Sequence, residues 1–346
     1  ADFVVLASAS YIHATPSTEF NWVQDSNWMY FCGIDIADAL LIIGGKDYLA
    51  VKRNKIAEIF DGKLDEELVE KSGLELIDMP TAKSMIKSKK VALIQSKNRY
   101  IANPAQRKFI YSIKNRKNIA KEVAHMRMVK EDQEISAIKK AIAITNKAFK
   151  SIDLNSKNEA DIAADVAHSL ISNKSTEAYQ SIIASGKNSL VLHYHQNNSP
   201  LKTPLLLDIG AKYMGYSADI SRTIVSTEKQ KQVYRIVEDL QKFALSQLRP
   251  GIDFRDYEKS VREEAKKSIS TLLPFKDIYY PHATSHHLGL DTHDFADYSL
   301  PLKENMVITV EPGVYIPEWG FGVRIEDDVV ITKDGAKVLS SSIGFR

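Results

Sequence analysis

The feature that most restricts how this chain can fold is a carboxylate inside an apolar strand. Residues 205–210 read Leu-Leu-Leu-Asp-Ile-Gly, a pattern typical of a buried strand that Asp208 interrupts. A second strand-like run, residues 218–225, carries Asp219 near its start. Gly215 lies between the two runs and suits a turn. The pattern therefore predicts a β-hairpin with one carboxylate in each strand.

The register of this hairpin decides whether the two carboxylates meet. A turn centred between Tyr213 and Met214 places Asp208 directly opposite Asp219, with Cβ atoms about 5 Å apart. Two like charges in that position repel each other unless a cation lies between them. The alternative is a solvated edge strand, which is the commoner setting for a single acidic residue in a strand.

The same pattern occurs again towards the C-terminus, which makes solvated edges a poor explanation for both hairpins. An apolar run ends in Glu311, and a second strand-like run carries Glu326. A hairpin centred between Glu318 and Trp319 places Glu311 opposite Glu326. Alternation along the return strand puts three charged side chains on one face: Arg324, Glu326 and Asp328.

Histidines cluster in two further segments, and they supply nitrogen ligands to the acidic pairs. These histidines are His193, His195, His282, His286, His287 and His293. Imidazole nitrogen with four carboxylates suits paired Mn²⁺, Co²⁺, Fe²⁺ or Zn²⁺, and two such ions sharing a hydroxide predict hydrolysis. A histidine beside proline or glycine is also common in turns. We therefore expect structural roles for His287 and His195, and structural or surface positions for His13, His125 and His168.

The chain of 346 residues exceeds the roughly 250–300 residues of a single core, which predicts two domains. Residues 1–118 alternate strand-like and helix-like patterns, with a hairpin at residues 39–51, a helix at 65–71 and a strand at 90–94. Residues 119–346 open with a helical period at 135–152 and contain further helices at about 229–248 and 253–269. A capping box at residues 156–159 is expected to start another helix.

Composition limits the partners and the environment of the protein. A net charge of +2 predicts no nucleic-acid partner and no anionic membrane surface, so the substrate is expected to be small. Cys32 is the single cysteine, which excludes an internal disulfide and a cysteine-rich metal site. No run reaches the roughly 18 apolar residues of a membrane span. We therefore expect a cytoplasmic protein.

Together these segments resemble the pita-bread metallopeptidases, which include aminopeptidase P, prolidase and methionine aminopeptidase. The matching blocks occur in the family's order at residues 208–211, 216–223, 285–294, 310–313 and 323–328. The resemblance covers essentially the whole second domain, and residues 27–33 resemble the small domain that precedes it. It implies an α+β chain with a C-terminal pita-bread catalytic domain at 119–346 and a smaller N-terminal mixed α/β domain at 1–118.

The resemblance also implies a role for each site residue. The ligands of two divalent metal ions would be Asp208, Asp219, His286, Glu311 and Glu326, with Asp219 and Glu326 bridging. His293 would stabilise the tetrahedral intermediate, and Glu311 would take the proton from the attacking water. Residues around the proline pocket would be His193, His282 and Arg324, with Tyr315 near the site.

Within the family the residues look most like aminopeptidase P. This implies an Xaa-Pro aminopeptidase that uses a metal-bridging hydroxide to release the first residue from peptides with proline in the second position. We expect Mn²⁺, with Co²⁺ or Zn²⁺ as alternatives, and a homodimer or higher homo-oligomer. Residues 295–305 lack an arginine that some aminopeptidase P enzymes carry, which puts the handling of longer peptides in question. A prolidase restricted to dipeptides and a non-enzymatic binding protein on the same fold are the alternatives.

Overall fold

The computed structural model describes residues 1–346 except 11–12, 16–17, 20–22, 53–54, 95–103 and 345–346. The chain forms two compact units, Ala1–Ala124 and His125–Arg346. The domain boundary predicted after residue 118 falls at the end of strand β8 and stays a prediction. Within the described part of the chain, no helix is both long and apolar enough to span a membrane.

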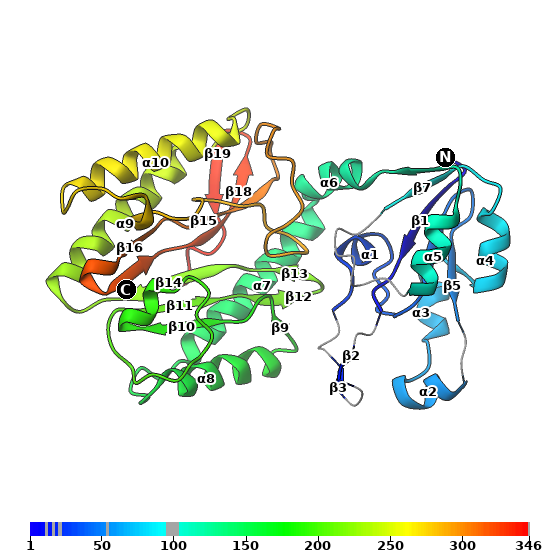
Figure 1. Ribbon diagram of the computed structural model, residues 1–346, viewed down its shortest axis with the longest axis horizontal. Helices are drawn as coiled ribbons and strands as arrows, with labels where there is room; N and C mark the ends of the chain where they lie inside the picture. Colours follow the sequence, from blue (N-terminus) through cyan, green and yellow to red (C-terminus); the bar gives the residue numbers. More distant parts are fainter. Residues whose placement is uncertain (11–12, 16–17, 20–22, 53–54, 95–103, 345–346) are drawn as a thin grey trace. The chain divides into compact units, whose positions relative to one another are not determined.

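The N-terminal unit is built around a mixed six-stranded sheet with the order β6-β5-β4-β1-β7-β8 (Figure 1). Its strands are β1 (Phe3–Ala7), β4 (Leu40–Ile43), β5 (Tyr48–Val51), β6 (Glu75–Asp78), β7 (Val91–Leu93) and β8 (Arg116–Asn118), and a separate pair is β2 (His13–Thr15) with β3 (Thr18–Glu19). The helices are α1 (Ser26–Phe31), α2 (Lys55–Asp61), α3 (Glu66–Lys71), α4 (Met79–Ile86) and α5 (Pro104–Ser112). The predicted hairpin β4–β5, the helix α3 and the strand β7 are confirmed.

The C-terminal unit combines long helices with several short sheets. Helix α6 (Ala120–Met128) begins in the first unit and ends in the second. The other helices of the second unit are α7 (Asp132–Ser151), α8 (Glu159–Ser172), α9 (Glu228–Gln247) and α10 (Phe254–Ser270), with the short 3₁₀ helices η1 (Gly186–Leu190), η2 (Asp277–Tyr279) and η3 (Pro317–Trp319). The strands are β9 (Thr176–Glu177), β10 (Ile182–Ser185), β11 (Leu205–Ile209), β12 (Ala211–Tyr213), β13 (Tyr216–Ser217), β14 (Ile220–Ile224), β15 (Val307–Val310), β16 (Gly313–Ile316), β17 (Phe321–Arg324), β18 (Asp327–Thr332) and β19 (Gly335–Val338).

Each half of this unit packs a helix pair on its own strands. The helices α7 and α8 bury one apolar core with β11 and β14, whereas α9 and α10 bury two others with the strands from β15 onwards. Figure 1 shows α8 and α10 at opposite edges of the unit with strands between them. The predicted helices over 135–152, 229–248 and 253–269 are confirmed as α7, α9 and α10. The strands between the pairs are where acidic residues from both halves can meet.

The predicted capping box at residues 156–159 is wrong by two positions. The N-cap of α8 is Asn158, whose Oδ1 accepts the N–H of Asp161 at 3.0 Å, while Asp161 accepts the N–H of Asn158 at 3.3 Å. Glu159 cannot fold back on Ser156 because its side chain is buried and binds other partners. The capping box is therefore formed by Asn158 and Asp161.

The first predicted hairpin has the right strands but a turn displaced by one residue. Its two central residues are Met214 and Gly215, with φ of 49° and 83°, the positive values of a type I′ turn. Asp208 therefore lies opposite Ser221, and the predicted pairing with Asp219 is wrong. The physical reason is that a type I′ turn needs positive φ at both central residues, and Gly215 adopts such a φ without strain.

Met214 destabilises this turn, and a substitution at this position should increase the stability of the protein. Its side chain is 73% exposed, and its backbone is in a left-handed region that methionine rarely adopts. Met214→Asn should raise the free energy of unfolding by about 0.5–1 kcal/mol, because asparagine tolerates this conformation. Urea unfolding would measure the gain. Met214→Leu is the control, and an equal gain there would contradict the backbone explanation.

The second predicted hairpin is confirmed in its register. Gly313 lies opposite Arg324 and Val310 opposite Asp327, the pairing that a centre between Glu318 and Trp319 requires. The predicted charged face is confirmed by contacts of its three members with the first hairpin: Arg324 with Asp208, Glu326 with Ser221, and Asp328 with the backbone N–H of Asp219.

Candidate active site

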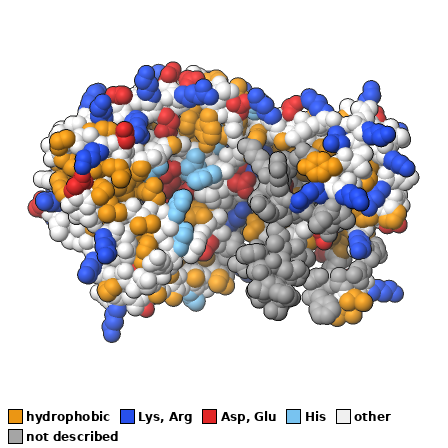
Figure 2. All heavy atoms as spheres, viewed as in Figure 1, with side chains coloured by type: hydrophobic (Ala, Val, Ile, Leu, Met, Phe, Trp, Pro, Cys, Tyr) orange, Lys and Arg blue, Asp and Glu red, His pale blue; other side chains and the backbone are white. Residues whose placement is uncertain are grey.

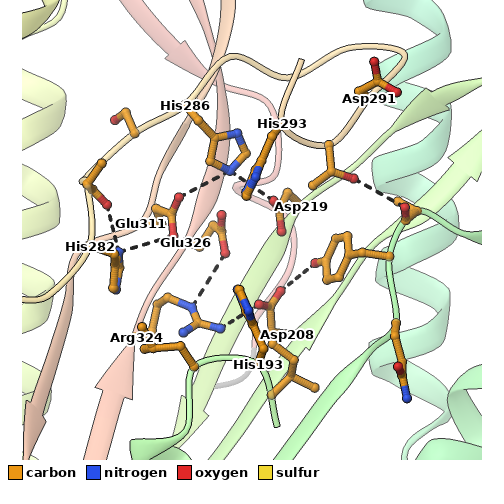
Figure 3. Close-up of a pocket in the computed structure, with 18 of the residues that line it drawn as sticks. His193, Asp208, Asp219, His282, His286, Asp291, His293, Glu311, Arg324 and Glu326 are labelled. Atoms are coloured by element: carbon orange, nitrogen blue, oxygen red, sulfur yellow. Dashed lines mark hydrogen bonds and ion pairs between the residues drawn. The ribbon is translucent and has the colours of Figure 1, made fainter. Parts of the chain in front are cut away.

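A cavity of about 760 Å³ in the C-terminal unit brings the predicted site residues together. Its lining includes Asp208, Asp219, His286, Glu311, Glu326, Arg324, His193, His282 and His293 (Figure 3). Figure 2 shows histidine and acidic side chains gathered on one face of this unit. The cavity thus collects both acidic pairs and most of the clustered histidines.

The five predicted metal ligands lie within strands, next to strands or in one loop. Asp208 lies in β11 and Glu311 follows β15, while Asp219 and Glu326 occupy short gaps before β14 and β18. His286 lies in the loop between η2 and β15. Asp219 and Glu326 are held in place by the hydrogen-bonded strands on either side, although neither residue belongs to a strand.

The ligand atoms converge from both halves of the unit. Candidate ligand atoms of Asp219, His286 and Glu326 all lie within 4.8 Å of one another. His286 Nε2 is 3.3 Å from Asp219 Oδ2 and 3.3 Å from Glu311 Oε1. His286 Nδ1 is 3.1 Å from the carbonyl oxygen of His287, so this nitrogen can donate there and leave Nε2 directed at the carboxylates.

Crowding of buried carboxyls gives the site a strong preference for positive charge. Burial, reinforced by Asp219 and opposed by His286, raises the pKa of Glu311 to about 8. Burial and the neighbouring carboxylates also raise the pKa of Asp208 and Glu326, against the opposing charge of Arg324. Divalent cations would relieve this repulsion, and four carboxylates with one imidazole nitrogen fit Mn²⁺, Co²⁺ or Zn²⁺.

Arg324 is committed to protein partners inside the cavity wall. Its Nε donates to Ser221 Oγ at 2.7 Å, one terminal nitrogen to Tyr315 Oη at 2.8 Å, and the other to Asp208 Oδ2 at 2.6 Å. The residue is 4% exposed. Its predicted contact with the proline ring stays a prediction, and its observed contacts orient a candidate metal ligand.

The remaining predicted residues surround the acidic cluster. His282 Nε2 is 3.0 Å from Tyr315 Oη, and His282 Nδ1 is 3.7 Å from Glu311 Oε2. Burial and the charge of Arg324 lower the pKa of His282 to about 4, so its ring is neutral near pH 7. The ring of His293 lies 4.2 Å from that of His286 between centroids. Their roles with substrate stay predictions.

The structure adds one residue that the sequence did not single out, and it places two histidines for which structural roles were expected. Tyr179 donates its hydroxyl hydrogen to Asp208 Oδ1 at 2.5 Å, and nothing in its local sequence indicates a site. His195, expected to be structural, lines the cavity with His193. His287 is confirmed as a core residue, 1% exposed and stacked on Phe254.

Glu258 on α10 supports the loop that carries His286, and it should make stability depend on pH. Its Oε2 accepts the N–H of Thr284 at 2.8 Å, and burial raises its pKa to about 7. The folded protein therefore keeps this proton in a range where the unfolded chain has lost it. The contribution of Glu258 to the free energy of unfolding should therefore fall by roughly 3 kcal/mol as pH rises from about 4.5 to 7.

Urea unfolding of the wild type and Glu258→Gln across this range would test the prediction. The variant stays neutral, so its stability relative to the wild type should increase with pH. Glu304→Gln, at an exposed position, should show no such trend. A pH-independent difference for Glu258→Gln would contradict the assignment.

Comparison with known proteins places this geometry in a family. The model of metallopeptidase family M24 matches residues 136–333, which is more than half of the chain. The chain belongs to metallopeptidase family M24. The Xaa-Pro dipeptidase of Pyrococcus horikoshii is 36% identical over 244 residues, covering 67% of this chain and 68% of that protein. Human Xaa-Pro aminopeptidase 3 is 28% identical, covering 98% of this chain and 78% of that protein.

Solved structures show the same fold for this M24 member over nearly its whole length. Aminopeptidase P from Escherichia coli superposes with a TM-score of 0.88 at 24% identity, covering 99% of this chain and 92% of that one. The predicted α+β architecture, a pita-bread catalytic domain preceded by a smaller mixed domain, is confirmed. The family resemblance inferred from the sequence is confirmed as well.

Proposed function

We propose that this M24 metallopeptidase is a dinuclear Xaa-Pro aminopeptidase, which releases the first residue from peptides with proline in the second position. The observation that carries the proposal is the convergence of Asp208, Asp219, His286, Glu311 and Glu326 in one cavity. Relatives named Xaa-Pro dipeptidase and Xaa-Pro aminopeptidase support a substrate with proline after the scissile bond. An imide bond lacks the N–H that extended-strand binding uses, so it needs a specialised site.

The residues of the cavity can divide the chemistry among them. Two divalent metal ions, with Mn²⁺ expected, would polarise the scissile carbonyl and lower the pKa of the attacking water. Glu311 would accept the proton of that water, and His293 would donate a hydrogen bond to the carbonyl oxygen as negative charge develops. His193 and His282 would contact the proline ring, with Tyr315 fixing the orientation of His282.

The alternative with specific support is an Xaa-Pro dipeptidase. The Pyrococcus horikoshii relative carries that name. A dipeptidase would need a cation for the free carboxylate of its substrate. Among the described residues that line the cavity, Arg324 is the one arginine and no lysine is present, and Arg324 binds Asp208. This favours the aminopeptidase.

Hydrolysis of three peptides after loading with Mn²⁺, Co²⁺ or Zn²⁺ would test the proposal. Mass spectrometry should show release of alanine from Ala-Pro-Ala-Lys and none from Ala-Ala-Ala-Lys. Cleavage of Ala-Pro alone would identify a dipeptidase. Preference for Ala-Ala-Ala-Lys would overturn the assignment of the proline pocket, and metal binding without any cleavage would favour a binding protein. The cytoplasmic location and the homo-oligomer stay predictions.

A further inference from the structure

A buried carboxylate outside the acidic cluster holds one wall of the cavity. Glu159, the first residue of α8, is 0% exposed. Its Oε1 accepts the N–H of Ser185 at 2.8 Å and the side-chain amide of Asn188 at 2.9 Å. Its Oε2 accepts the hydroxyl of Tyr194 at 2.7 Å and the N–H of Ser199 at 3.0 Å. Each oxygen thus receives two hydrogen bonds, all from neutral donors.

These four donors come from three consecutive segments, which are also joined by another bond, from Asn188 Nδ2 to Ser199 Oγ at 2.9 Å. Ser185 ends β10, Asn188 lies in η1, and Tyr194 and Ser199 belong to the loop that follows. A buried carboxylate that loses its hydrogen-bond donors destabilises the fold by far more than one ordinary hydrogen bond stabilises it. The folded protein is therefore expected to keep all four donors in contact with Glu159. The four bonds thus tie residues 185, 188, 194 and 199 to one buried point at the start of α8.

The loop that Glu159 holds carries part of the cavity wall. Tyr194 is 5% exposed and points its hydroxyl at Glu159. Its two neighbours, His193 and His195, both line the cavity, as does Leu192. Movement of Tyr194 would therefore move His193, the predicted contact of the proline ring.

We propose that Glu159 is a positioning residue that sets His193 against the substrate. The inference rests on the proposed Xaa-Pro peptidase function. Its predicted effect falls on substrate binding, because none of the five candidate metal ligands lies on residues 185–199. Glu159 acts through Tyr194 and the adjacent backbone.

Two conservative variants separate this role from a general loss of structure. Glu159→Gln keeps the shape but places an amide donor against one pair of the present donors. Tyr194→Phe removes one hydrogen bond and adds no donor. Both should raise KM for Ala-Pro-Ala-Lys, by roughly tenfold for Glu159→Gln, and leave kcat within about twofold. Glu304→Gln is the matched control and should change neither constant.

A double-mutant cycle with His193→Ala tests whether the effect passes through His193. If it does, Glu159→Gln should add little to KM in the His193→Ala background. If the increase in KM of the double variant equals the product of the increases in the two single variants, the proposal is overturned. A fall in kcat at unchanged KM in Glu159→Gln would overturn it as well. Equal metal content and a melting temperature above the assay temperature would confirm that each variant is folded.

Hydrogen–deuterium exchange supplies a readout that needs no catalysis. The amides of Ser185 and Ser199, which donate to Glu159, and that of Val191, which donates to Asn188 just before the cavity wall, should exchange about tenfold faster in Glu159→Gln. In Glu304→Gln they should exchange at the wild-type rate. Unchanged exchange in Glu159→Gln would overturn the positioning role whatever the activity. Failure of the wild type to cut any Xaa-Pro peptide would instead reject the proposed function, and with it the role of His193.

Discussion

Replacing His286 with alanine should leave a folded protein whose peptide hydrolysis is at least about 100-fold slower. Changes one step removed from a metal ligand already cost about 10–100-fold, and His286 supplies the imidazole of the proposed ligand set. Its Nε2 lies between Asp219 and Glu311, at 3.3 Å from each. Without it the cluster retains carboxylates alone, so bound Mn²⁺ per chain should fall as well. Elemental analysis after dialysis and the release of alanine from Ala-Pro-Ala-Lys would measure both effects.

His168→Ala is the matched control for this experiment. His168 is exposed on α8, and its Nε2 is 3.5 Å from Ser172 Oγ. It should keep the metal content and the activity of the wild type. Retention of full metal content and activity by His286→Ala would overturn the proposed position of the metal centre.

Asp294→Ala should reduce the free energy of unfolding by about 3–5 kcal/mol, the usual cost of removing one partner from a buried ion pair. Asp294 is 5% exposed and binds both Arg127 and Lys130, with Lys130 Nζ at 3.0 Å. These cations are themselves 3% and 2% exposed. The N–H of Asp294 also donates to the carbonyl oxygen of His287 at 2.8 Å, which closes the loop between His286 and His293.

The control is Asp291→Ala in the same ion-pair cluster. Asp291 also binds Arg127, at 3.0 Å, but its side chain is 47% exposed. Its loss should cost no more than about 1 kcal/mol, because water replaces much of what an exposed pair supplies. Urea unfolding would compare the two variants. Similar decreases in the free energy of unfolding for both variants would mean that burial of Asp294 does not explain its contribution to stability.

The sequence predicted the second hairpin more accurately than the first, and the turns explain why. Centring on Glu318 and Trp319 gave the observed register of β16 and β17. In the first hairpin the turn includes Met214 in a left-handed conformation. Methionine rarely adopts a positive φ, so its presence gave no reason to place Met214 at the centre of the turn. The pattern of side chains alone was also compatible with a register displaced by one residue.

Some contacts of the candidate site had no readable signal. Glu159 looks like an ordinary acidic residue in the first turn of a helix, a position that favours negative charge at the surface. Its burial arises from donors that lie 26–40 positions further along the chain. Tyr179 likewise becomes a site residue only because folding places it against Asp208. The carboxylates were readable because a charge within an apolar run is unusual locally.

The two strand gaps that hold Asp219 and Glu326 have a consequence for the order of assembly. Their segments join through contacts such as Glu326 N–H to the carbonyl oxygen of Ser221, which are 105 positions apart along the chain. A nascent chain still lacking residues 311–326 can form the first hairpin but holds only part of the ligand set. Contacts of such long range form slowly, so metal capture should be a late event in biosynthesis. A chain released before residues 311–326 are made would lack Glu311 and Glu326, and Asp208 and Asp219 would remain without these partners.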